Sequence, residues 1–204
     1  MAKNRFEKIA SEDARAVANE CLRVSFEYLD WDSEEFFFHG LKVEYYQKFF
    51  DCLSEIKRCK EKDIVEQTHP SLIPKSIFNE GGTKNGFPDS VIKKISDNLF
   101  VQSRDRESSD SEAIYLTSKR AFEVRVAKAY GRIHGFIWNN TFHVVWFDPA
   151  HNLYPIKKYG VRRHEDFAKV RCFSPDETVR LRDELKQCQE EYDELYDIRA
   201  NGNA

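Results

Sequence analysis

The sequence lacks the residue patterns that mark several large classes of protein. Its five cysteines are odd in number, scattered, and never form a C-x-x-C pair, which argues against a disulfide framework and against a zinc knuckle. No apolar run approaches the roughly 20 residues that span a bilayer, and the charged N-terminus does not resemble a signal peptide. We therefore expect a cytoplasmic protein with free thiols and no membrane contact.

Complete catalytic motifs are also missing. The chain has no glycine-rich phosphate loop, no G-x-S-x-G nucleophile elbow and no glycine-flanked cysteine with a partner motif. Its six histidines show neither H-x-x-x-H nor H-E-x-x-H spacing, so a metal is not expected. These absences disfavour nucleophilic hydrolases, nucleotide kinases and metalloenzymes, and they imply no cofactor.

Charge, in contrast, is present and strongly segregated. The net charge of −3 divides into −5 for residues 1–118, +7 for residues 119–171 and −5 for residues 172–204. A basic block of this kind is suited to a polyanionic partner such as RNA. It could equally be covered by the acidic C-terminal segment of the same chain.

Periodicity in the first half predicts both helices and strands. Ser11 is a candidate N-cap for a first short helix, and alternation over residues 22–28 and 35–39 predicts a hairpin. Apolar residues spaced by three and four from Val43 to Ile56 predict a helix. After irregular residues 61–90, a short helix is expected to follow Asp89.

The middle of the chain is expected to change from loop to sheet. The run SRDRESSDSE, residues 103–112, is charged and rich in small residues, which is typical of a solvated, flexible loop. Alternating residues then predict strands at 113–116 and 122–126 and two more up to Trp146. Asn139 and Asn140 suit a two-residue turn, which places Val145 opposite His134 and His143 opposite Phe136.

Together these elements predict an α+β protein with a small antiparallel sheet and helices packed on one side. Residues 1–172 form the domain, and residues 173–204 form a C-terminal coiled-coil-like helix that Ser174 caps. Packing of this helix on its own domain and homodimerisation remain open alternatives. The apolar positions with coiled-coil spacing, through which a homodimer would form, are Leu181, Leu185, Cys188, Tyr192 and Leu195.

Polar side chains are concentrated in the segment from Gly131 to Pro155, where we place the candidate site. Asp148 and His151 flank an Asp-Pro bend, in which a carboxylate can orient an imidazole for acid–base chemistry or can simply cap the turn. Mixed aromatic and basic side chains on the neighbouring strands suit nucleobases and phosphates. The candidate nucleic-acid-binding residues are Lys119, Arg120, Arg125, Lys128, Trp138 and His143.

The order of these strands, FEVRVAKAYGRIHGFIWNNTFHVVWFDPAHNLYP, resembles the C-terminal core of RelE-type toxins over about residues 120–155. In that family a basic strand, a strand with an arginine, a hairpin and an H-x-x-x-Y-like ending occur in this order. The resemblance implies a metal-independent endoribonuclease in which cations hold phosphate and a histidine or tyrosine moves protons. The positions that match the family are Arg125 or Lys128, Arg132, His151 and Tyr154.

Two functions of different class follow from these patterns. The first is a metal-independent endoribonuclease of toxin or host-defence type, with RNA as its partner. Its catalytic candidates are Arg132, His134, Asp148, His151 and Tyr154. The second is a non-enzymatic dimeric module of a regulatory or phage-defence system, which would bind a protein partner such as an antitoxin and whose histidines are structural.

Overall fold

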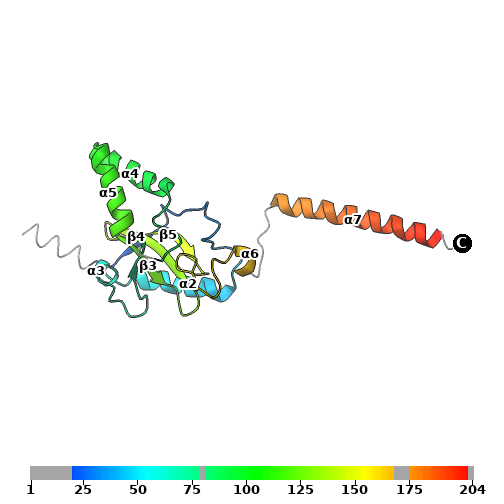
Figure 1. Cartoon of the computed structure of the whole chain (residues 1–204), viewed down its shortest axis with the longest axis horizontal. Helices are drawn as coiled ribbons and strands as arrows, with labels where there is room; N and C mark the ends of the chain where they lie inside the picture. Colours follow the sequence, from blue (N-terminus) through cyan, green and yellow to red (C-terminus); the bar gives the residue numbers. More distant parts are fainter. Residues whose placement is uncertain (1–19, 79–80, 168–174, 202–204) are drawn as a thin grey trace, which may run out of the picture. The chain divides into compact units, whose positions relative to one another are not determined.

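A computed structural model describes residues 20–78, 81–167 and 175–201 and confirms the α+β class. The chain divides into two units between residues 169 and 170, and the first contains a five-stranded sheet in the order β1-β5-β4-β3-β2 (Figure 1). The sheet is mixed, not purely antiparallel as predicted, because β1 runs parallel to β5. The strands are β1 (Arg23–Ser25), β2 (Lys75–Ser76), β3 (Ala121–Arg125), β4 (Arg132–Trp138) and β5 (Thr141–Asp148).

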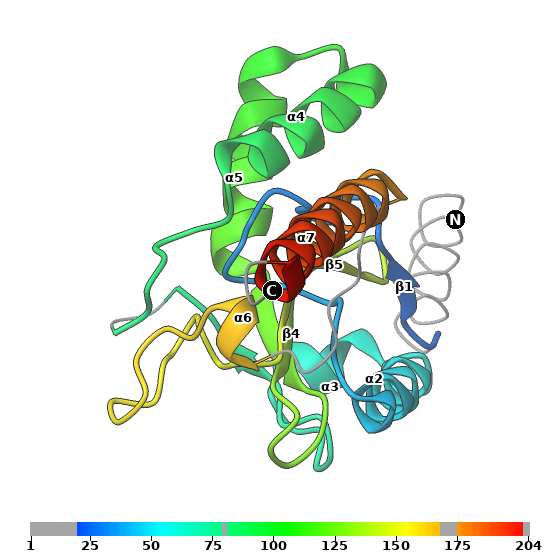
Figure 2. The same ribbon diagram turned by 90° about the vertical axis from the view of Figure 1, so that its right-hand side faces the viewer.

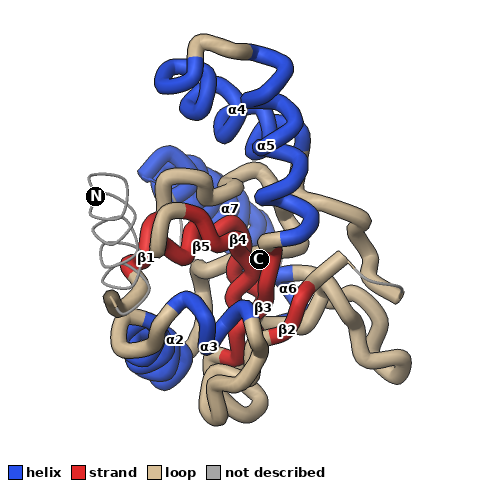
Figure 3. Tube along the Cα trace, turned by 90° about the vertical axis from the view of Figure 1, so that its left-hand side faces the viewer, coloured by secondary structure: helices blue, strands red, loops and turns tan. Residues whose placement is uncertain are grey.

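Helices cover both faces of the sheet, which corrects the prediction that they pack on one side. The predicted helix α2 (Val43–Ile56) is confirmed. Its buried residues form one apolar core with one face of β3, β4 and β5. The other face forms a second core with α4 (Asp89–Ser103) and α5 (Arg106–Lys119). Figure 3 shows the strands between α2 and the α4–α5 pair. The short helices are α3 (Glu61–Val65) and α6 (His164–Phe167).

The predicted hairpin of residues 22–28 and 35–39 is wrong. Only Arg23–Ser25 is a strand, and residues 35–39 form turns and loop with no strand partner. The apolar residues of this loop fill the two cores on their own: Phe36 stacks on Trp146 at 4.2 Å between ring centroids, and Phe37 belongs to the α2 core. Their apolar pattern therefore reflects aromatic packing instead of strand pairing.

Helix α4 ends at Ser103 and α5 covers residues 106–119, which overturns the predicted loop at 103–112 and the predicted strand at 113–116. Arg104 ends α4 in the left-handed conformation, and the Asp105 carboxylate accepts the Ser108 N–H at the start of α5. Small polar residues make the helix–helix contact, since Ser96 bonds to Asp110. Figure 2 shows these helices projecting together from the sheet. The helix expected after Asp89 is thus present, but it is longer than expected.

The meander of β3, β4 and β5 and its Asn139-Asn140 turn are confirmed. Both asparagines have positive φ, 48° and 52°, as a primed two-residue turn requires. The predicted pairing of Phe136 with His143 is correct, but His134 lies opposite Trp146 instead of Val145. A bulge between His134 and Gly135 causes this shift by one residue.

The bulge has a steric requirement at Gly135. A Cβ atom there would overlap the carbonyl oxygen of His143 on the neighbouring strand. Glycine is therefore the residue that lets β5 approach β4 at this point. Beyond the bulge, Trp146 and Asp148 share the sheet face of His134 and Arg132.

The second unit contains α7 (Pro175–Asn201), a single helix that confirms the predicted C-terminal helix. The described side chains on its coiled-coil stripe are exposed. The first helix predicted from Ser11 and the Ser174 cap lie outside the described residues. Across the part of the chain that is described, no helix is both long and apolar enough to cross a membrane.

We predict that Gly135→Ala lowers the free energy of unfolding by about 2 to 3 kcal/mol, because the added methyl group forces β4 and β5 apart. Urea denaturation measures the change. Gly86→Ala is the matched control, since a Cβ at Gly86 meets nothing within 4 Å, and its effect should stay within about 0.5 kcal/mol. Equal stability of the two variants would contradict the steric role of Gly135.

Candidate functional site

A pocket of about 350 Å³ opens at the end of the sheet where β4 begins and β5 ends. This volume is within the usual range for small-molecule sites. Four of the five catalytic candidates line it, whereas the fifth, His134, does not. The lining residues are Lys75, Ser76, Glu123, Arg132, Asp148, His151 and Tyr154.

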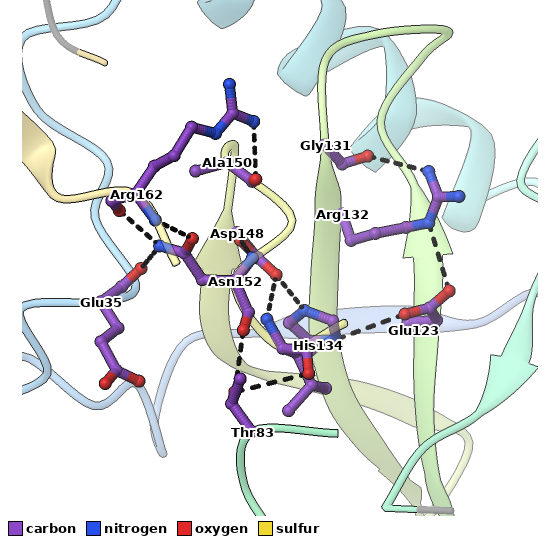
Figure 4. Close-up of polar contacts among 11 residues, drawn as sticks. Glu35, Thr83, Glu123, Gly131, Arg132, His134, Asp148, Ala150, Asn152 and Arg162 are labelled. Atoms are coloured by element: carbon purple, nitrogen blue, oxygen red, sulfur yellow. Dashed lines mark hydrogen bonds and ion pairs between the residues drawn. The ribbon is translucent and has the colours of Figure 1, made fainter. Parts of the chain in front are cut away.

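Asp148 lines the pocket and is almost completely buried. Its carboxylate accepts the backbone N–H groups of Asn152 at 2.6 Å and Leu153 at 2.9 Å, and its Oδ2 lies 3.1 Å from Nε2 of His134 (Figure 4). Burial acts to raise the pKa of Asp148, but the bond to His134 and the two N–H groups outweigh burial and lower it. Asp148 is therefore a charged group that shapes the following turn.

His134 lies beneath the pocket and has no exposed surface. Its Nε2 faces Asp148, and its Nδ1 is 3.9 Å from Oε2 of Glu123, beyond hydrogen-bond distance. Both ring nitrogens are thus directed at carboxylates inside the protein. The arrangement makes His134 a positioning residue for Asp148 instead of a group that contacts a ligand.

Arg132 is held at the pocket wall by two bonds. Its Nε donates to Oε1 of Glu123 at 3.2 Å, and its Nη1 donates to the Gly131 carbonyl at 3.2 Å. These bonds use two of the five N–H groups of the guanidinium. The side chain is consequently fixed in place and still has donors to offer an anion.

His151 occupies a strained position in a rigid turn. Its φ is +61°, a conformation that costs energy for a residue other than glycine. The turn is braced by Asn152, whose amide nitrogen donates to the carbonyls of Glu35 and Arg162, both at 2.8 Å, and by Arg162, which donates to the Ala150 carbonyl at 2.6 Å. The backbone of the turn is therefore fixed on both sides of His151.

The surroundings of His151 also set its charge. Burial lowers its pKa below the ordinary histidine value, and the positive charge of Arg132 lowers it further. The imidazole is consequently neutral near pH 7. A neutral imidazole at a pocket wall can accept a proton, as a general base must.

Two more groups complete the wall. The hydroxyl of Tyr154 is buried and makes no hydrogen bond to a described residue. Its ring is held against the 82–83 segment, where the Thr83 N–H donates to the Leu153 carbonyl at 2.9 Å. Lys75 lies directly opposite Glu123 in the β2–β3 pairing, and its side chain forms no ion pair with the described residues.

The predicted nucleic-acid-binding residues do not form one surface. Lys119, Arg120 and Trp138 lie at the far end of the sheet, since Ala121 pairs with Phe136 there. Arg120 is bonded to Glu61 and to the Ile137 carbonyl. These groups are well separated from the pocket along the strands.

The other three predicted nucleic-acid-binding residues, His143, Arg125 and Lys128, differ in accessibility. His143 is buried and stacks on Phe136 at 4.9 Å between ring centroids, so it does not offer a binding surface. Arg125 pairs with Arg132 across β3 and β4, and exposed Lys128 follows in the connecting turn. Only Arg125 and Lys128 of the six therefore lie near the pocket end of the sheet.

The pocket also contains three residues that the sequence did not single out, namely Lys75, Ser76 and Glu123. Glu123 had a usable signal, because it alternates with Phe122 and Val124 and so shares a face with Arg125. Lys75 and Ser76 had none, since their strand is two residues long and lies in a proline- and glycine-punctuated region. Among the described residues, no group of three or more His, Cys, Asp or Glu side chains could hold a metal ion.

Comparison with known proteins gave no relative: no family model, no curated protein and no solved structure matches the chain.

We predict that His143 makes stability fall in mild acid. Burial lowers its pKa to about 4, although the carboxylate of Glu27 acts in the opposite direction. The unfolded chain takes up the proton near pH 6.5 and the folded chain near pH 4, so about 3 kcal/mol of unfolding free energy is lost between these values. His143→Phe retains the stacked ring without a titrating nitrogen. Urea denaturation at pH 7, 5.5 and 4 should show a smaller decline for this variant, and parallel declines would refute the assignment.

Proposed function

We propose that the protein is a metal-independent endoribonuclease of toxin or host-defence type. The observation that carries the proposal is the convergence of Arg132, His151 and Tyr154 on one pocket, with Lys75 beside them. Two cations, a neutral imidazole and a phenol are the groups that cleavage of RNA through its own 2′-hydroxyl requires.

Each group has a defined part in this reaction. His151 takes the proton of the 2′-hydroxyl, and the 2′-oxygen then bonds to phosphorus while the bond from phosphorus to the 5′-oxygen breaks. Tyr154 gives its proton to the leaving 5′-oxygen, so the products are a 2′,3′-cyclic phosphate and a free 5′-hydroxyl. Arg132 and Lys75 stabilise the charge on the non-bridging oxygens. Proton return from His151 to Tyr154 through solvent restores the site.

The resemblance to RelE-type toxins supports the same reaction and a role as a cytoplasmic toxin. It includes Arg132, His151 and Tyr154, which are pocket residues. His134 and Asp148 act in this proposal as positioning residues, because the first has no exposed surface and the second is bonded to the turn that carries His151. Arg125 and Lys128 would extend the cationic surface along the bound strand.

The first test of this proposal is cleavage of single-stranded RNA by the purified protein. His151→Ala and Arg132→Ala should each lower the rate by a factor of about 10² to 10³. Activity should decline in acid only below pH 6.5, because the base form of His151 persists below the ordinary histidine pKa. A gel assay with RNA and its 2′-deoxy counterpart measures both effects.

His39→Ala is the matched control for the cleavage assay. His39 is also a histidine with a lowered pKa, but it is exposed, stacks on His164 and does not line the pocket. Its variant should retain full activity. Intact RNA with the wild-type protein, or full activity in His151→Ala, would refute the proposal. In cells, growth arrest with fragmented RNA should occur with the wild type and not with the Arg132→Ala/His151→Ala variant.

A second candidate function is favoured by α7. Leu181, Leu185, Tyr192 and Leu195 are 41 to 69% exposed on one stripe of this helix, and Cys188 lies in the middle of the stripe. Exposed apolar residues with coiled-coil spacing are typical of helices that pair. In this second function, the protein is a dimeric module that binds a protein partner, and the α7 helices of two copies pair with each other.

We predict that the full-length protein is a dimer and that Leu185→Asp/Tyr192→Asp makes it a monomer, because the charges fall at the centre of the seam. Light scattering after size exclusion measures the mass. Val179→Asp is the control, since Val179 is equally exposed but lies off the stripe. In a parallel dimer, mild oxidation should also link two copies through Cys188, and Cys188→Ser should abolish the link. A monomeric wild type would exclude this module.

A further inference from the structure

The charges that line the pocket are balanced. Of the described residues around it, Lys75 and Arg132 are cationic, whereas Glu123 and Asp148 are anionic. His151 adds no charge at neutral pH, because its pKa is lowered. A pocket of this kind attracts an anion through local geometry instead of through excess positive charge.

The two carboxylates differ in how their charge is neutralised. Asp148 is bonded to His134 and to two backbone N–H groups, so its charge is largely satisfied inside the protein. Glu123 is directly opposite Lys75 on one side and bonded to Arg132 on the other. It therefore lies between the two cations that an incoming phosphate would use.

A phosphate in the pocket must consequently share both cations with Glu123. A phosphodiester carries one negative charge, whereas a phosphomonoester carries nearly two at pH 7. Repulsion by a fixed carboxylate grows in proportion to the charge of the ligand. Glu123 thus penalises the monoester more than the diester at the same position.

We propose that Glu123 is a specificity residue that makes the pocket select internal phosphodiesters of a nucleic-acid strand over terminal phosphomonoesters. This inference rests on the proposed ribonuclease function and gives that site its substrate class. It also gives a physical reason for a buried carboxylate beside a phosphate-binding arginine, where simple anion affinity would favour a neutral residue. The selection acts on binding and can be measured without cleavage.

The test compares two uncleavable probes, the dinucleotide 2′-deoxyadenylyl-deoxyadenosine and deoxyadenosine 3′-monophosphate, by calorimetric titration at pH 7.5 and low salt. The wild type should bind the diester and discriminate against the monoester. Glu123→Gln retains an oxygen that can accept the Arg132 N–H but removes the charge. We expect it to bind the monoester roughly tenfold more tightly than the wild type does and the diester roughly threefold more tightly, because the effect scales with the charge of the ligand.

Two further variants test whether a change in probe binding arises from the charge at the pocket or from a change in the fold. Glu61→Gln is the matched control, since Glu61 also pairs with an arginine, Arg120, at the far end of the sheet, and its variant should bind both probes as the wild type does. Lys75→Gln changes an exposed edge-strand residue and should weaken monoester binding more than diester binding. If Glu123→Gln fails to fold, the ratio of diester to monoester affinity in the wild type tests the inference.

The outcomes separate the inference from the proposed function. Diester binding by the wild type with an unchanged monoester-to-diester ratio in Glu123→Gln would overturn the specificity role alone. A wild type that binds the monoester more tightly than the diester would overturn it as well. If the wild type binds neither probe and leaves RNA intact, both the inference and the ribonuclease proposal fail.

Discussion

The β-bulge where β5 passes Gly135 determines which side chains meet in the pocket. Before the bulge, His143 shares a face of the sheet with Phe136. At the bulge, Val145 and Trp146 both contribute to the α4–α5 core. After it, the alternation of β5 side chains between the two faces is shifted by one residue. Without that extra residue, Phe147 would take the face of His134, and Asp148 would point into the α2 core. The bulge therefore brings Asp148 to His134, and through Asp148 it fixes the turn that carries His151.

The pocket is built from groups that are costly to bury, and the structure offsets that cost by pairing. Asp148, His134, Glu123 and Arg132 are nearly buried. Hydrogen bonds join Asp148 to His134 and Arg132 to Glu123, and Nδ1 of His134 lies 3.9 Å from Oε2 of Glu123. Breaking such a chain leaves an uncompensated charge, so its members are constrained together. Asn152 extends the same principle to neutral groups, because its amide links the segments around Glu35 and Arg162. The exposed members of the site are thus held by a rigid polar framework.

Much of this fold follows from local patterns, and the parts that do not have identifiable causes. The alternation of β3 to β5, the Asn139-Asn140 turn and the spacing in α2 are local and were predictable. Residues 106–112 have weak local preference for a helix, and they are helical because Asp110 and Ser109 bond within the α4–α5 pair, a tertiary contact. The pairing of β4 with β5 beyond the bulge could not be predicted either, because no rule of alternation places an extra residue at Val145. Arg132, His151 and Tyr154 were predicted as site residues, but Lys75 enters only through strand pairing.

The polar residues between Gly131 and Pro155 divide into two sets with different roles. Asp148 and Asn152 bond to partners inside the protein, and His134 bonds to Asp148 through its Nε2, so the effect of these three residues on a ligand is indirect. Arg132 and His151 retain a donor and a neutral imidazole at the pocket wall, and Tyr154 retains a buried hydroxyl with no hydrogen bond to a described residue. Changes in the first set alter folding and function together and cannot separate them. Evidence about chemistry must therefore come from the second set, together with Lys75 and Glu123, where charge can be altered while the framework that holds the turn remains intact.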